Sequence, residues 1–388
     1  MSSFESVDHA FLRKRSALKW GRWDDDVIAL SVADIDFPPP QGIKDALLKV
    51  IEEDRTPYGM HAGDPDVLEV VCEKLNRINR IQASFDDVHM IPGTMFSIFI
   101  SCYHALKPGD EAIICPAPIY PPFIQNIINA GATPVFSPVK YDNNCALDLD
   151  LLRSQINPRT KMIMICNPHN PCGRVLTQKE LETVAELAIE NDLLIFSDEL
   201  YEDMVFKGKH ISIASLSPEM MERTITSFGF SKAYGIPGYR IAYLVHRGKR
   251  MKILKEQIHD IIVHTDTLAQ AAAKAALTQS GNWLPSLRKH INEMHGYALN
   301  RLRDMKGVWC SIPEATPFLF PNLVVYGLSS NEMTDYLLHE ARIAVQSGST
   351  FGPPGEGHIR INVGTSKAVI KEALDRMEKA LKKLKINK

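Results

Sequence analysis

Lys232 has unusual surroundings for a lysine. It lies in SFGFSKAYGIPGYRIAY (residues 227–243), a stretch rich in glycine and apolar residues, and the next positive charge is Arg240, eight residues later. A solvated surface lysine needs no such surroundings. A nucleophilic lysine must be neutral when it attacks, although its usual pKa is about 10.4, and both apolar surroundings and a nearby arginine lower that pKa. The stretch therefore indicates a lysine that acts as a nucleophile.

Other polar residues stand directly after apolar runs that resemble buried strands. Asn170 follows KMIMIC, Asp198 and Tyr201 follow LLIFS, and Ser231 and Lys232 follow TITSFG. The carboxyl ends of parallel strands lie at one edge of a sheet, and ligands of open α/β sheets bind there. We therefore expect these side chains to meet in one site.

The elements expected to position these loops alternate along the chain. Apolar, strand-like runs cover residues 111–116, 133–139, 161–167, 192–198, 223–229 and 240–245. Helical patterns separate several of them, as in residues 177–191, where Thr177 and Glu180 match a capping box. Alternating strands and helices predict an α/β fold with a mainly parallel sheet that is covered on both faces.

A helix is expected to begin at Gly93, Thr94 and Met95, within IPGTM. The free N–H groups and partial positive charge of a helix N-terminus suit a phosphate, and glycine allows its close approach. An ordinary helix start is the alternative explanation, just as Lys232 or Asp198 alone could be a loop residue. Together, the candidates match pyridoxal phosphate, which needs a lysine, an acid, hydrogen-bond donors and a phosphate cradle.

The pattern changes after about residue 250, where long helical segments, a few strand-like pieces and a final helix from about Ser366 follow. We expect three parts. Residues 1–44 form an N-terminal segment that packs on the small domain, residues 45–285 form a large cofactor-binding domain, and residues 286–388 form a small α+β domain.

Composition excludes several classes of function. The 388 residues carry a net charge of -2, so no global field attracts nucleic acid or an anionic membrane. Neither a signal-peptide run nor a stretch of about 18 apolar residues occurs, so no membrane span is expected. The seven cysteines are scattered without a CxxC pair. That pattern favours a cytoplasmic protein without a metal site.

The motifs NPHNPCG, SDELY and SKAYGIPGYR, in this order and spacing, resemble those of class I/II aminotransferases, which share the fold of aspartate aminotransferase. The resemblance covers nearly the whole chain, from VADIDFPPP to HIRINVG. It implies pyridoxal 5'-phosphate as cofactor and a large domain with a mainly parallel seven-stranded sheet between helices, plus a smaller α+β domain. It also implies transfer of the α-amino group of an L-amino acid to a 2-oxo acid.

The resemblance implies roles around the cofactor ring. Lys232 matches the lysine that forms the Schiff base and later moves the α-proton. Asp198 matches the carboxylate that keeps the pyridine nitrogen protonated. Tyr201 and Asn170 match the donors to the phenolate oxygen, and Tyr120, in PAPIYPPF, matches the aromatic ring that stacks on the cofactor.

A second group of residues matches the positions that bind the cofactor phosphate. Gly93, Thr94 and Met95 match the phosphate-binding helix start, and Arg240 matches the arginine that binds the same phosphate. Many relatives also have a phosphate-binding serine three residues before the lysine. This chain has glycine there, at position 229, and Ser231 or Ser227 is the candidate substitute.

Substrate and subunit contacts complete the resemblance. Arg360, in HIRINVG, matches the arginine that binds the substrate α-carboxylate, for which its planar fork is suited. Ala33 and Asn170 match further substrate contacts. Tyr58, in PYGMHAG, resembles a tyrosine that reaches the phosphate of the neighbouring subunit, which implies a homodimer with shared active sites.

The N-terminal stretch RSALKWGRWDDDVIALSVADIDF instead resembles the cystathionine β-lyase branch of this fold, as does GEGHIRINVG. That branch typically has histidine at the position of Tyr201 and lacks the arginine found here at position 240. Because these two positions lie closer to the chemistry, we place transamination first and C–S β-elimination second.

Two further classes of protein would show sequence features that are absent here. A nicotinamide-dependent dehydrogenase should show GxGxxG between a strand and a helix, whereas SGSTFGPPGEG is followed by a strand. A regulator built on this fold usually carries an added DNA-binding domain, for which no basic patch is present. A non-catalytic, chaperone-like role is the remaining alternative.

Overall fold

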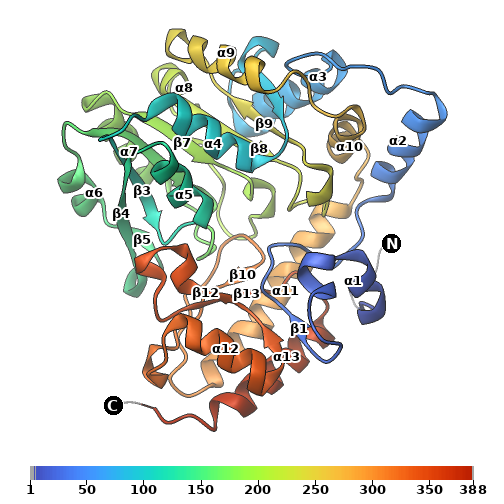
Figure 1. Ribbon diagram of the computed structural model, residues 1–388, viewed down its shortest axis with the longest axis vertical. Helices are drawn as coiled ribbons and strands as arrows, with labels where there is room; N and C mark the ends of the chain where they lie inside the picture. The colour runs from blue at the N-terminus through green and yellow to red at the C-terminus, as the bar shows by residue number, and fades with distance from the viewer. Residues whose placement is uncertain (1–3, 5, 387–388) are drawn as a thin grey trace.

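The computed structural model describes residue 4 and residues 6–386 (Figure 1). Its main element is an eight-stranded sheet with the order β2-β9-β8-β7-β6-β3-β4-β5. The strands are β2 (Val88–Ile91), β3 (Glu111–Ala117), β4 (Thr133–Lys140), β5 (Ala146–Leu147), β6 (Thr160–Cys166), β7 (Leu194–Asp198), β8 (Thr224–Gly229) and β9 (Ala242–Val245). All six strands expected between residues 111 and 245 are therefore confirmed.

The sheet has eight strands rather than the expected seven. Strands β4, β3, β6, β7 and β8 are parallel neighbours, whereas β9 and β2 on one side and β5 on the other add antiparallel pairs. The additional edge strand β5 is only two residues long and pairs with the end of β4. A strand this short leaves no apolar run in the sequence, which is why the pattern did not predict it.

Helices cover both faces of the sheet because successive residues of a buried strand point to opposite sides. In β6, Met162 and Met164 pack with one set of helices, while Ile163 and Ile165 pack with the other. The first set is α4 (Thr94–Ala105), α5 (Pro121–Asn129) and α9 (Lys252–Ile261), and the second is α6 (Leu149–Gln155), α7 (Gln178–Glu190) and α8 (Pro218–Arg223). The predicted capping box at the start of α7 is confirmed.

The C-terminal part contains a second, three-stranded antiparallel sheet with the order β10-β13-β12. Its strands are β10 (Phe318–Leu319), β12 (Gln346–Ser347) and β13 (Ile359–Asn362), and its helices are α11 (Trp283–Asp304), α12 (Ser330–Ala341) and α13 (Lys367–Leu381). The N-terminal helix α1 (His9–Arg15) lies near this part, and β1 (Ile28–Ala29) pairs in parallel with β11 (Ile343–Ala344). The domain boundaries at residues 44 and 285 stay a prediction.

Three helices, α2 (Gln41–Glu52), α3 (Pro65–Lys74) and α10 (Thr267–Thr278), pack together beside the antiparallel edge of the large sheet (Figure 1). Among the described residues, none of the helices combines the length and the apolar character that crossing a membrane requires.

A buried ion pair joins two parts of the N-terminal segment. Lys19 Nζ donates to Asp36 Oδ1 at 2.9 Å and to the Asp34 carbonyl at 2.8 Å, and Trp20 Nε1 donates to the same Asp36 oxygen at 2.8 Å. Lys19 and Asp36 are almost fully buried. Lys19 and Trp20, from the stretch RSALKWGRW, thus fix the segment from Ser31 to Asp36, which forms one wall of the site described below.

Candidate active site

Two adjoining hollows surround Lys232 at the carboxyl edge of the large sheet. An inner chamber of about 80 Å³ and an outer cavity of about 790 Å³ share Ala33, Tyr120, Lys232, Pro237 and Arg240 in their walls. The remaining predicted site residues of the inner chamber are Thr94, Met95, Asn170, Asp198, Tyr201 and Ser231. Arg360 lines the outer cavity. All predicted site residues except Gly93 and Tyr58 therefore line one of the two hollows.

The order of the strands explains this convergence. Strands β6, β7 and β8 are parallel neighbours, and Asp198, the last residue of β7, is in register with Cys166 of β6 and Ser227 of β8. The loops that follow these strands consequently leave the sheet at the same edge, which brings Asn170, Asp198 and Lys232 together.

The surroundings of Lys232 lower the pKa of its side-chain amine. The pKa of Lys232 is lowered to about 8, chiefly by burial in the cavity and also by Arg360 and Arg240, while Asp34 and Asp198 oppose the shift. Nζ donates a hydrogen bond of 2.6 Å to the Ala33 carbonyl, which holds the amine at the junction of the two hollows. A substantial neutral fraction therefore exists near pH 8, as a nucleophile or general base requires.

Asp198 is a buried carboxylate that lacks a cationic partner among the described residues. It is 5% exposed, and its Oδ1 accepts a hydrogen bond of 3.1 Å from the Leu200 N–H. Burial raises the pKa of Asp198 to about 7, and the neighbouring charge of Glu199 adds to this effect. A carboxylate in this position gains stability from any ligand that brings a positive charge or a proton to it.

A buried network beneath Asp198 was not predicted from the motifs. Glu199 accepts hydrogen bonds from the hydroxyls of Ser197 at 2.9 Å and Ser212 at 2.8 Å, and it pairs with His210 Nε2 at 2.7 Å. Although burial opposes it, the charge of Glu199 raises the pKa of His210. The network fixes the backbone next to Asp198. Its members were not recognisable because Ser212 and His210 come from an irregular loop without periodic pattern.

The start of α4 and Arg240 together form a cradle for an anion. Gly93, the residue before α4, has φ +88°, and a Cβ there would lie 2.9 Å from Arg240 Nη2. Only glycine allows the guanidinium to approach the helix start this closely. Arg240 itself has a left-handed backbone, with φ +50°, and among the described residues its guanidinium donates a single hydrogen bond, to the Pro237 carbonyl at 3.3 Å. The cation and the helix N–H groups point to a phosphate between them.

The structure explains the glycine three residues before Lys232. A Cβ on Gly229 would lie 2.8 Å from Leu200 Cδ1, so a serine would displace that side chain. Of the two candidate substitutes, Ser227 is fully buried in β8, where its hydroxyl pairs with the Ser97 hydroxyl at 2.6 Å. Ser231 lines the inner chamber, so it is the one of the two whose side chain is available to a phosphate.

Arg360 is a buried cation without a carboxylate partner among the described residues. It is 4% exposed, and it donates to Asn170 Oδ1 at 3.0 Å and to the Ser31 carbonyl at 2.8 Å. Its guanidinium carbon lies 4.2 Å and 5.0 Å from the ring centres of Phe318 and Phe351, and its Nε has no hydrogen-bond partner. Burial lowers the pKa of Arg360 to about 10. An anionic ligand such as a carboxylate would compensate this charge.

Two tyrosines in the wall of the inner chamber can donate hydrogen bonds. Tyr120 precedes α5, and its hydroxyl donates to Met95 Sδ at 3.5 Å. Tyr201 is almost fully buried and packs edge-on against Phe318, with ring centres 5.5 Å apart. Burial raises the pKa of both hydroxyls, so both stay protonated at neutral pH and can donate hydrogen bonds.

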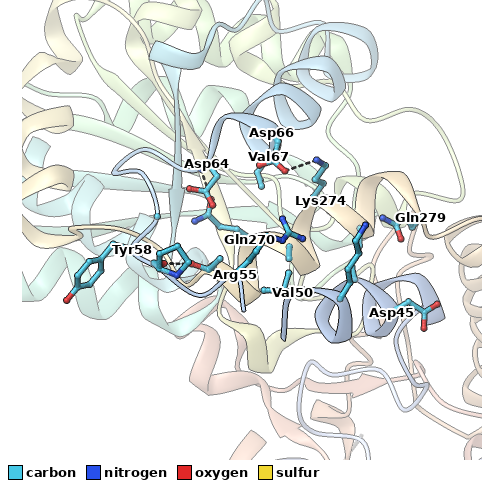
Figure 2. Close-up of a pocket in the computed structure, with 17 residues that line it drawn as sticks. Asp45, Val50, Arg55, Tyr58, Asp64, Asp66, Val67, Gln270, Lys274 and Gln279 are labelled. Atoms are coloured by element: carbon cyan, nitrogen blue, oxygen red, sulfur yellow. Dashed lines mark hydrogen bonds and ion pairs between the residues drawn. The ribbon is translucent and has the colours of Figure 1, made fainter. Parts of the chain in front are cut away.

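Tyr58 is the predicted site residue that this chain does not bring to Lys232. It is 90% exposed and lies at the rim of a separate hollow of about 650 Å³ between α2, α3 and α10, as Figure 2 shows. Its ring points away from that hollow and lies 5.0 Å from the ring of His264. Lys274, one of the basic residues that line this hollow, is paired with Asp66 at 2.7 Å. A role for Tyr58 in catalysis therefore requires a second chain.

Comparison with known proteins gives a consistent result. Residues 25–377 match the family model described as aminotransferase class I and II. The aspartate aminotransferase of Pyrococcus abyssi is 35% identical over 366 residues, which cover 93% of each chain. The aromatic-amino-acid aminotransferase 2 of Thermococcus litoralis is 35% identical over 387 residues, 98% of each chain. A pyridoxal-phosphate-bound structure from Clostridium difficile 630 is similar with a TM-score of 0.90 at 26% identity, covering 98% of this chain and 100% of that one.

The charge of Asp34 is expected to control the acidity of Lys232. The pKa of Lys232 is about 8 with Asp34 opposing the effect of burial, so Asp34→Asn, which removes this opposing charge, is expected to lower the pKa below that value. Reductive methylation with isotope-labelled formaldehyde, followed by NMR titration of the ligand-free protein, measures this midpoint. The matched control is Asp45→Asn, which changes an exposed carboxylate at the other hollow. An unchanged or higher midpoint in Asp34→Asn contradicts the assignment.

Proposed function

The chain belongs to the aminotransferase class I and II family and is a pyridoxal-phosphate-dependent aminotransferase, and we propose that Lys232 is the residue with which it moves the α-amino group of an L-amino acid to a 2-oxo acid. One observation carries this assignment of residues. Lys232, Asp198 and Arg360, which come from three separate segments, converge on two connected hollows at the carboxyl edge of the sheet.

The charges of the cavity fit the cofactor. The buried Asp198 suits the protonated ring nitrogen, since none of the described cations forms an ion pair with it. Arg240 and the start of α4 suit the phosphate, with the hydroxyls of Thr94 and Ser231 beside them. Lys232 lines the same chamber as both groups, so its amine would hold the cofactor through the aldehyde. When bound, pyridoxal phosphate supplies this aldehyde and an electron-accepting ring.

Two side chains are oriented as donors to the phenolate oxygen. Because Asn170 Oδ1 accepts a hydrogen bond from Arg360, the amide nitrogen of Asn170 is turned the other way and can donate within the inner chamber. Tyr201 contributes a buried hydroxyl that stays protonated. Tyr120, in the wall shared by both hollows, provides the aromatic face for the ring.

The substrate is oriented by Arg360 and deprotonated by Lys232. The Arg360 guanidinium binds the α-carboxylate, because two parallel hydrogen bonds fix its direction as well as its position. With its pKa lowered to about 8, Lys232 Nζ can then remove the proton from the α-carbon and hold it for return. The Ala33 carbonyl, 2.6 Å from Nζ, positions the amine for this transfer.

We propose that the protein is a homodimer in which Tyr58 reaches the phosphate of the neighbouring subunit. The exposed position of Tyr58 supports this, as do the exposed apolar side chains of Met60, Tyr103 and Val263, each more than half exposed in the single chain. Analytical ultracentrifugation is expected to give twice the chain mass of 43.5 kDa. A mixture of Lys232→Ala and Tyr58→Phe chains is expected to regain activity in hybrid dimers that contain one intact site. A monomeric species with full activity contradicts the proposal.

We also propose a cytoplasmic location. Its support is that all seven cysteines are buried and unpaired, as is usual in a reducing compartment. Cell fractionation tests this proposal, and recovery of the native protein from the secreted fraction contradicts it.

Transamination is tested by its need for an acceptor. We expect the purified protein, supplied with pyridoxal phosphate, to convert an L-amino acid to its oxo acid only when a 2-oxo acid is added. Lys232→Ala is expected to lower kcat by about 10²-fold or more, because it removes both the covalent anchor and the general base. The control Lys207→Ala removes an exposed lysine and keeps full activity. Pyruvate and thiol release from L-cystathionine without an acceptor would instead indicate β-elimination.

A further inference from the structure

The turn that carries Tyr201 is anchored at both of its ends. Its closing hydrogen bond of 3.0 Å runs from the Glu202 N–H to the Glu199 carbonyl, so Leu200 and Tyr201 occupy the two central positions. Both central residues line the inner chamber. The Glu199 end is held by the hydrogen-bond network described above, and a separate pair of side chains holds the Glu202 end.

The side chains of Lys74 and Asn79 hold the carboxylate of Glu202. Lys74 Nζ donates to Glu202 Oε1 at 2.5 Å and to Asn79 Oδ1 at 3.2 Å, and Asn79 Nδ2 donates to Glu202 Oε2. Each carboxylate oxygen therefore has its own donor, and the two donors are bonded to each other. The side chains of Lys74 and Glu202 are only 7% and 8% exposed, so this contact is a buried ion pair.

The helix that supplies both donors changes its winding at this point. Helix α3 continues directly into a π-helical turn, Leu75–Asn79, and the Arg80 N–H donates to the Leu75 carbonyl, five residues earlier. Lys74 and Asn79 are also five positions apart, and the wider turn brings their side chains to the same carboxylate. Single π-helical turns inside α-helices are rare and occur frequently at functional sites.

The charge of Lys74 favours the ionised form of Glu202. Burial raises the pKa of Glu202, and the charge of Lys74 is the strongest opposing influence. Burial lowers the pKa of Lys74, but the charges of Asp203 and Glu202 raise it well above its usual range. Of these two carboxylates, Glu202 is the one that forms an ion pair with Lys74 among the described residues. A side-chain oxygen of Glu199, one of Glu202 and a ring nitrogen of His210 lie within 4.8 Å of one another, so the two anchors of the turn meet.

We propose that Lys74 and Asn79, acting through Glu202, position the Tyr201 hydroxyl in the inner chamber. The proposal rests on the proposed function, in which Tyr201 donates to the phenolate oxygen of the cofactor. An ion pair buried this deeply contributes little net stability, because taking both charges out of water costs about as much as their attraction returns. It does allow only one geometry for the groups that it joins. Since Glu202 closes the turn, this fixed geometry leaves Tyr201 a single orientation.

NMR of the ligand-free protein, with fluorotyrosine incorporated, tests the proposal without any reaction. In the apolar variant, Lys74→Met, Asn79→Ala and Glu202→Leu together replace the contact without leaving an unpaired polar group in it, so the fold is expected to be retained. The Tyr201 resonance, assigned by its loss in Tyr201→Phe, is expected to shift or broaden. The resonance of Tyr326, in the C-terminal part, is expected to stay unchanged.

A smaller change and a matched control accompany the apolar variant. Asn79→Ala alone keeps the ion pair and removes one of the two donors, so a smaller shift of the Tyr201 resonance is expected. The control, Lys383→Met with Glu340→Leu, removes an exposed lysine–glutamate pair and is expected to leave that resonance unchanged. A Tyr201 resonance that stays unchanged in both the apolar variant and Asn79→Ala overturns the proposal.

Steady-state kinetics connects the position of Tyr201 to the reaction. In the apolar variant, kcat is expected to fall about tenfold, whereas KM for the 2-oxo acid changes less than about twofold because Arg360 is untouched. In the Tyr201→Phe background, the same substitutions are expected to change kcat less than about twofold, since the hydroxyl that they position is already absent. Losses that multiply in the combined variant overturn the proposal.

The two experiments separate this proposal from the function itself. A shifted Tyr201 resonance in a protein that transaminates no pair of substrates supports the positioning role and refutes the proposed function. An unshifted resonance in an active aminotransferase refutes the positioning role and leaves the function standing.

Discussion

The burial of charge at the carboxyl edge of the sheet is the constraint on which the site depends. Asp198 and Arg360 are 5% and 4% exposed, and neither has an ion-pair partner among the described residues. Holding an unpaired charge away from water costs several kcal/mol. A ligand that presents a protonated ring nitrogen to one and a carboxylate to the other removes this cost. The same desolvation lowers the pKa of Lys232 to about 8, so binding and nucleophilicity have one physical origin.

The rest of the fold serves this arrangement. The parallel register places Asp198 beside the ends of the neighbouring strands. The hydrogen-bond network around Glu199 fixes the backbone next to Asp198. The N-terminal segment supplies the Ala33 carbonyl, which accepts a hydrogen bond from Lys232, and the Ser31 carbonyl, which accepts one from Arg360. These contacts join residues that are 199 and 329 positions apart in the sequence. The site is therefore complete only when the N-terminal segment is docked.

The structural features that could be predicted from the sequence leave a local pattern of residues, whereas those that could not be predicted leave none. Strands buried on both faces must be apolar throughout, so their runs revealed six strands and the loops that follow them. The two-residue β5 left no such signal, and in β2 the polar His89 is tolerated because it pairs with His246 at 3.1 Å. Long-range tertiary contacts, such as that of Lys232 with the Ala33 carbonyl, have no local pattern. The choice of Ser231 over Ser227 likewise depended on which hydroxyl already had a partner.

Chemical trapping tests the central claim most directly. The protein is incubated with one equivalent of pyridoxal phosphate, reduced with borohydride, digested and analysed by mass spectrometry. Among the described lysines, Lys232 is the one that combines a lowered pKa with a place in the chamber lined by Arg240 and Asp198, so the label is expected on its Nζ, in the peptide containing SKAYG. Label on another lysine, with Lys232 unmodified, would contradict the account.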